Sequence, residues 1–90
     1  MNDTIRAVVQ KVILNGRHGP YAIATSEDVI GSITFSLERA VWREERIPEH
    51  GIVVLLSDLQ KKRAGWRAMV GRFLKPSDEQ HQPTPRSIQK

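Results

Sequence analysis

Short apolar runs dominate this chain, and their period favours strands over helices. Along residues 30–37, apolar side chains at alternate positions share one face, while Ser32, Thr34 and Ser36 share the other. This alternation is typical of a half-buried strand. Residues 52–56 are apolar without a break, as in a strand that is buried on both faces. The two patterns together predict an all-β fold of short strands.

Three further segments have the composition of strands, so the sequence predicts five strands. They cover residues 5–14, 21–25, 30–37, 52–56 and 66–74. The first is long for a single strand and is expected to bend so that it serves two sheets. Glycine and proline mark a loop over residues 15–20, and Glu27 and Asp28 form a polar turn. The expected core residues are Val8, Val12, Leu14, Ile23, Ile33, Phe35, Val54, Leu56, Ala68 and Val70.

Residues 38–49 differ from the strands, because charged side chains surround Val41 and Trp42. The sequence predicts a short helix here, which Pro48 and Gly51 would end. Trp42 is expected to plug the bottom of the barrel. Five strands with a short helical insert between strands three and four have the layout of a small OB-fold-like barrel. An SH3-like barrel needs a similar number of strands and remains the alternative.

The positive charge of the chain is concentrated in residues 59–76. The whole chain has 14 basic and 10 acidic side chains, for a net charge of +4. Clustered cations raise the local potential and displace the counterions condensed on phosphates, so polyanions are natural partners of such a stretch. Residues 61–65 are predicted to link strands four and five as a charged hairpin loop. The stretch contains no carboxylate, and its cations are Lys61, Lys62, Arg63, Arg67, Arg72 and Lys75.

The order of features over residues 8–73 resembles the cold-shock and S1 group of nucleic-acid-binding OB domains. The matching segments are the basic strand 9–12, the strand start 19–23, the third-strand segment 31–36, the glycine-led segment 51–54 and the sequence Gly65-Trp66-Arg67-Ala68. The chain lacks the phenylalanine cluster with which cold-shock domains stack bases, and it has Thr34-Phe35-Ser36 where they have Phe-Val-His. The resemblance implies RNA or single-stranded DNA binding on strands two and three and the adjoining loops.

The candidate binding residues combine cations for phosphates with aromatic rings for bases. Long cations that project from a hairpin suit phosphate contacts, and bases stack on aromatic rings for about 1–3 kcal/mol each. Alternatively, the cations keep a sheet edge solvated, and Trp66 caps the open end of the barrel. The expected nucleic-acid-binding residues are Lys61, Lys62, Arg63, Trp66, Arg67 and Arg72 around the hairpin, and Arg17 and Tyr21 at the first loop.

Other classes of function find little support in the sequence. The chain has no cysteine, so it has neither a disulfide nor a thiolate metal site. His18, His50 and His81 lack the spacing of metal ligands, and no cofactor is expected. Without a phosphate-binding glycine loop or a paired nucleophile and base, no enzyme activity is expected. No signal peptide and no apolar run of about 18 residues is present, which by elimination predicts a cytoplasmic protein with no membrane contact.

One domain is expected over residues 1–76, followed by a disordered polar tail over residues 77–90, where Gln, Ser, Thr and Pro dominate. The predicted function is binding of RNA or single-stranded DNA with low sequence specificity. The alternative is a protein–protein interaction module or small subunit that binds no nucleic acid. A third possibility is an oligomer whose barrel edges pair.

Overall fold

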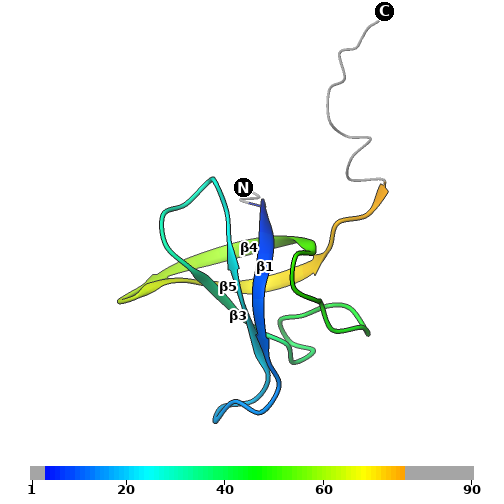
Figure 1. The fold of residues 1–90 in the computed structure, drawn as a ribbon. Helices are drawn as coiled ribbons and strands as arrows, with labels where there is room; N and C mark the ends of the chain where they lie inside the picture. The colour runs from blue at the N-terminus through cyan, green and yellow to red at the C-terminus, as the bar shows by residue number, and fades with distance from the viewer. Residues whose placement is uncertain (1–3, 77–90) are drawn as a thin grey trace, which may run out of the picture.

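The computed structural model describes residues 4–76, which form five β-strands closed into one barrel (Figure 1). The strands are β1 (Ile5–Ile13), β2 (Tyr21–Thr25), β3 (Ile33–Ser36), β4 (Val53–Lys62) and β5 (Gly65–Phe73). Their order around the barrel is β1-β2-β3-β5-β4, and β4 pairs with β1 to close it. All neighbours are antiparallel except β3 and β5, which run parallel. The predicted all-β barrel of five strands is confirmed, and the predicted tail lies outside the described residues.

Strand β1 is shared between two partners, as its length predicts. Its first half, from Ile5 to Val8, pairs with β4, and its second half, from Val8 to Ile13, pairs with β2. The register with β2 shifts by one residue between Val9 and Lys11. A bulge of this kind bends a strand and increases its twist, so β1 passes from one side of the barrel to the other without a break.

The core combines a few large side chains with small ones. Phe35 and Trp42 are almost fully buried, whereas β2 contributes only Ala22 and Ala24 to the interior. The ring centroids of Phe35 and Trp42 are 5.7 Å apart, and Trp42 meets Phe73 edge-on at 4.9 Å. Large rings opposite alanines suit the narrow interior of a small barrel.

The expected core is right for β3 and β4 and partly wrong for β1, β2 and β5. In β5 Ala68 is buried, whereas Val70 is only half-buried. In β1 the inward residues are Ala7 and Val9, whereas Val8 is 38% exposed and Leu14, just after the strand, is 60% exposed. In β2 the alanines point inward and Ile23 is only half-buried. Both strands have apolar residues at consecutive positions, so alternation alone does not decide which face is buried.

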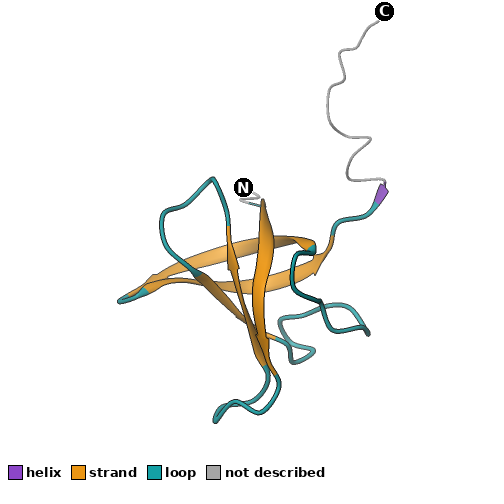
Figure 2. Cartoon of the chain, in the orientation of Figure 1, coloured by secondary structure: helices purple, strands orange, loops and turns teal. Residues whose placement is uncertain are grey.

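The short helix predicted within residues 38–49 is wrong, because the segment forms one turn at residues 39–41 followed by an irregular loop (Figure 2). The backbone N–H groups of Val41 and Trp42 donate to the carbonyl oxygen of Glu38 at 2.9 and 2.8 Å. Gly71 of β5 then donates to the carbonyl of Val41 at 2.9 Å and accepts a second bond from the segment. The apolar residues of the segment are adjacent rather than three or four apart, so a helix would have no apolar stripe to bury.

Trp42 plugs the barrel, and this prediction is confirmed. Its side chain is 2% exposed, and its indole Nε1 donates a hydrogen bond of 2.7 Å to the carbonyl of Arg46. Gly71 makes room for the ring, because a Cβ at that position would lie 3.1 Å from Trp42 Cε3 and 3.0 Å from Leu56 Cδ2. A single buried tryptophan therefore fills the end of the barrel, which the predicted helix was expected to cover.

The β4–β5 hairpin extends past the barrel body (Figure 1). Along β4 the inward positions change from Val54 and Leu56 to Leu59, because Asp58 has a φ of +56°. Aspartate is one of the few non-glycine residues that adopt this left-handed conformation at low cost. The hairpin turn is shorter than the expected loop over residues 61–65, since both lysines belong to β4 and only Arg63 and Ala64 lie between the strands.

Candidate functional site

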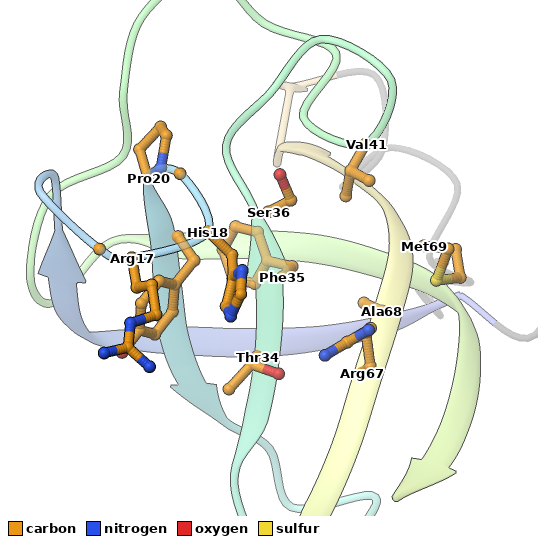
Figure 3. Close-up of a pocket in the computed structure, with 13 residues that line it drawn as sticks. Arg17, His18, Pro20, Thr34, Phe35, Ser36, Val41, Arg67, Ala68 and Met69 are labelled. Atoms are coloured by element: carbon orange, nitrogen blue, oxygen red, sulfur yellow. The ribbon is translucent and has the colours of Figure 1, made fainter.

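A pocket of about 510 Å³ opens on the outer face of the barrel, where β2, β3 and β5 lie near the turn between β1 and β2 (Figure 3). Three of the predicted binding residues, Arg17, Tyr21 and Arg67, line it. His18 and Met69 also line it, although the sequence singled out neither as a binding residue. Neither belongs to a pattern that a single sequence displays, so only the fold brings them to the site.

The β1–β2 turn holds its two central side chains toward solvent. The N–H of Gly19 donates to the carbonyl of Gly16 at 3.1 Å, and the φ of Gly19 is +101°, so a glycine at this position closes the turn without strain. Arg17 and His18 lie between the two glycines and are exposed. A Cβ at Gly16 would be 2.9 Å from Cε1 of Tyr21, which shows that the tyrosine ring packs against the turn. The turn therefore presents a cation beside a half-buried aromatic ring.

Two further cations share the outer face that leads to the pocket. Arg67 is paired with Gln60 of β4 and with Thr34 of β3. Lys62 follows Gln60 by two residues, so alternation along the strand directs both to one face. Figure 3 shows Arg17 and Arg67 on opposite sides of the pocket. Lys62, Arg67 and Arg17 therefore follow one another along the outer face, from the hairpin to the β1–β2 turn.

Lys61 and Trp66 lie on the other face of the hairpin. The ammonium of Lys61 is 5.2 Å from the centroid of the Trp66 ring, a distance at which a cation is attracted to the ring face. The indole Nε1 donates to the carbonyl of Ile30 at 3.1 Å, and the ring is partly buried against the core. Trp66 thus ties the β2–β3 loop to the hairpin, and a base that stacks on this ring face has to displace Lys61.

Gly65 provides the second tie between the hairpin and the β2–β3 loop. The N–H of Trp66 donates to the carbonyl of Ser32 at 2.9 Å. A Cβ at Gly65 would lie 2.6 Å from that same carbonyl oxygen, and the φ of Gly65 is +145°. The start of β5 therefore approaches the loop so closely that only glycine fits.

The variant Gly65→Ala is expected to lose about 2–3 kcal/mol of unfolding free energy, since it combines an unfavourable φ with a backbone clash. Gly51 gives a matched control, because its φ is +88° but nothing lies within 4 Å of a Cβ there. Gly51→Ala is expected to cost only about 1–2 kcal/mol, the cost of placing a side chain at an unfavourable φ. Thermal unfolding followed by circular dichroism separates the two, and equal losses would contradict the close approach at Gly65.

The remaining predicted residues occupy two other places. Arg63 is exposed at the hairpin turn, next to Lys61 and Lys62. Arg72 is half-buried and pairs with Leu55 of β4, which in turn pairs with Arg6 of β1. The structure therefore groups Arg17, Tyr21 and Arg67 at the pocket. It leaves Arg72 on a different wall of the barrel.

Within residues 4–76, no three acidic or histidine side chains gather closely enough to hold a metal ion. No helix in the same range has the length and apolar character needed to cross a membrane. No family model, no curated protein and no solved structure matches this chain.

Proposed function

We propose that this protein is an OB-fold that binds RNA or single-stranded DNA with low sequence specificity. The strand order β1-β2-β3-β5-β4 supports the OB assignment, together with the bent β1 that pairs at both ends. The parallel pairing of β3 with β5 favours it further. Parallel neighbours require a crossover connection, so a meander of hairpins, as in the SH3-like alternative, does not produce this order.

The observation that carries the binding proposal is the succession of exposed cations along one outer face. Lys62 and Arg67 stand on paired strands, and Arg17 stands on the turn at the opposite side of the pocket. Lys61 and Arg63 add positive charge at the hairpin end. Long cations fixed on a rigid scaffold neutralise phosphates at defined positions along a strand.

A single strand suits this surface better than a duplex. The pocket and the Tyr21 ring lie among the cations, and only unpaired nucleotides present base faces and edges to such features. Contacts to phosphates carry no information about sequence. A surface in which phosphate contacts predominate therefore binds many sequences with similar affinity.

The test of this function is the salt dependence of binding. If four cations contact one strand, log K is expected to fall with log salt at a slope near −3, from about 0.7 per phosphate. Fluorescence anisotropy of labelled single-stranded RNA, single-stranded DNA and duplex, each over a range of salt concentrations, measures this slope. The triple variant Lys61→Ser, Lys62→Ser, Arg63→Ser is expected to bring the slope to about −1.4, since the contacts of Arg17 and Arg67 remain.

Two outcomes would contradict the proposal. One is a slope near zero, and the other is unchanged binding by the triple variant. A tight protein complex that survives nuclease treatment would instead favour the protein–protein interaction module. In that case the cations would face an acidic surface on the partner rather than phosphates.

A further inference from the structure

The wall of the barrel has an opening between β3 and β5. Among the described residues, the parallel ladder pairs Ile33 with Trp66 and Thr34 with Arg67, and it ends there. Both strands continue past this point, β3 to Ser36 and β5 to Phe73. The two strands therefore run on without pairing to each other.

The wall closes again at Gly71. An isolated parallel bridge joins Gly71 to Trp42, and the N–H of Gly71 donates to the carbonyl of Val41 at 2.9 Å. The opening thus has two ends, one at Thr34 and Arg67 and one at Val41 and Gly71. The pocket of the candidate site occupies it, since residues from the end of β3, the middle of β5 and the turn before Trp42 line that pocket (Figure 3).

The opening exposes one backbone donor and one backbone acceptor. The N–H of Trp66 donates to the carbonyl of Ser32, which establishes which backbone groups of the two strands face each other. Because these groups alternate along a strand, Thr34 and Ser36 direct theirs toward β5, and Ala68 directs its own toward β3. A continued ladder would next join the N–H of Ser36 to the carbonyl of Ala68. The ladder stops before that bond, so a donor and an acceptor lie side by side in the opening.

The side chains around these groups are apolar and uncharged polar within the opening, with a cation on each side. Tyr21, Val41 and Met69 line the pocket and are half-buried. Phe35 and Ala68 are each 1% exposed and offer almost no surface. Arg17 and Arg67 stand on the two sides of the pocket. Its volume falls within the range of about 300–1,000 Å³ that is usual for small-molecule sites. A slot with half-buried apolar and aromatic surface and a backbone donor beside an acceptor, flanked by cations, matches the face, edge and phosphate of one nucleotide.

We propose that this opening, the β3–β5 seam, holds one base of the bound strand. The base edge meets the N–H of Ser36 and the carbonyl of Ala68, its face lies against the apolar lining, and Arg17 and Arg67 contact the adjoining phosphates. The inference rests on the proposed function and deepens it. One nucleotide is held by its base, while its neighbours are held mainly by their phosphates.

Strands that carry a single base test this inference. The probes are a fully abasic deoxyribose-phosphate strand and the same strand with one central adenine, cytosine, guanine or thymine. In the wild-type protein, at least one of the four bases is expected to tighten binding roughly tenfold over the abasic strand, which corresponds to the gain from one held base. The gain should disappear in Met69→Trp, whose larger side chain fills the seam, and remain in Met69→Leu, which leaves it open.

The possible outcomes separate the failure of the seam from the failure of the proposed function. Salt-sensitive binding to the abasic strand, with no gain from any base, would overturn the seam and leave the proposed function standing. An undiminished gain in Met69→Trp would overturn the seam as the place of the base. Absence of binding to every strand would overturn both proposals.

A second measurement avoids any dependence on the folding of Met69→Trp. In the wild-type protein, the amide proton resonance of Ser36 is expected to shift when the single-base strand is added and to stay in place with the abasic strand. The amides of the hairpin turn provide the control, because phosphate contacts shift them with both strands. A Ser36 amide that does not respond to the base would overturn the inference.

Discussion

Replacement of Trp42 by alanine is expected to remove a large part of the stability of the barrel. The ring is 2% exposed and packs against Phe35 and Phe73, and loss of a buried aromatic side chain of this kind costs about 3–5 kcal/mol. A domain of this size has a total stability of about 4–11 kcal/mol, so the variant keeps more than half of it at the upper end of this range and almost none at the lower end. Urea denaturation followed by far-ultraviolet circular dichroism measures the loss.

The variant Trp42→Phe separates the packing of the ring from its hydrogen bond. It keeps an aromatic ring against both neighbours but loses the bond from Nε1 to the carbonyl of Arg46. We expect a cost of about 1–3 kcal/mol, from the buried acceptor that loses its donor and from the smaller ring. If Trp42→Ala lost less than the phenylalanine variant, Trp42 would not be the plug of the barrel.

The strands were largely predictable because their signals are local. The alternation along β3, the apolar start of β4 and the length of β1 each depend on neighbouring residues. Trp42 was also predictable as a plug, since a large ring among charged residues has few other places to go. The bend of β1 follows from the same reasoning, because one long strand next to short ones has to change partners.

What the sequence could not predict depends on contacts between distant segments. Val8 and Val9 are equally apolar, and only the bulge in β1 and the large rings inside decide which one faces the core. The segment around Val41 forms a single turn and does not continue as a helix, because Gly71, thirty residues later, pairs with the backbone of Val41 and Arg43. The buried face of β1 and the conformation around Val41 therefore cannot be predicted from the local sequence of those segments.

Part of the candidate site was also predictable from the sequence, and part of it was not. Arg17, Tyr21 and Arg67 were predictable as cations and an aromatic ring near loops, and the fold brings them to one pocket. The seam itself was not predictable, because it arises where a parallel ladder stops between residues that are more than thirty positions apart. The hairpin cations were predictable as a cluster, but their division between two faces depends on the register of β4 with β5.

Charge reversal at Lys62 and Arg67 is expected to have the largest effect on binding. Each contact between a cation and a phosphate contributes about 1.5 kcal/mol or more, so the double variant Lys62→Glu, Arg67→Glu should weaken binding to a single strand about a hundredfold. The loss should diminish as salt screens the new carboxylates. Anisotropy titrations at low and moderate salt measure both effects.

Arg6 provides a matched control for Arg67. Both are exposed arginines on strands, but Arg6 lies on β1 opposite Leu55, away from the β3–β5 side of the barrel. Arg6→Glu and Arg67→Glu change the net charge equally, so a difference between them reports position and not total charge. We expect roughly tenfold weaker binding for Arg67→Glu and little change for Arg6→Glu. Equal effects would contradict a defined path for the strand.

The same variants decide between phosphate binding and protection of the hairpin edge. A carboxylate keeps a strand edge solvated as effectively as an ammonium or guanidinium group, because any charge there opposes edge pairing. Lys62 stands at this edge, whereas Arg67 is paired on both sides. If neither residue contacts phosphates, the double glutamate variant stays monomeric and its binding to nucleic acid does not change. If they neutralise phosphates, the variant stays monomeric but binding falls. Anisotropy therefore distinguishes the two roles, and light scattering on the same preparation checks that the variant is a monomer.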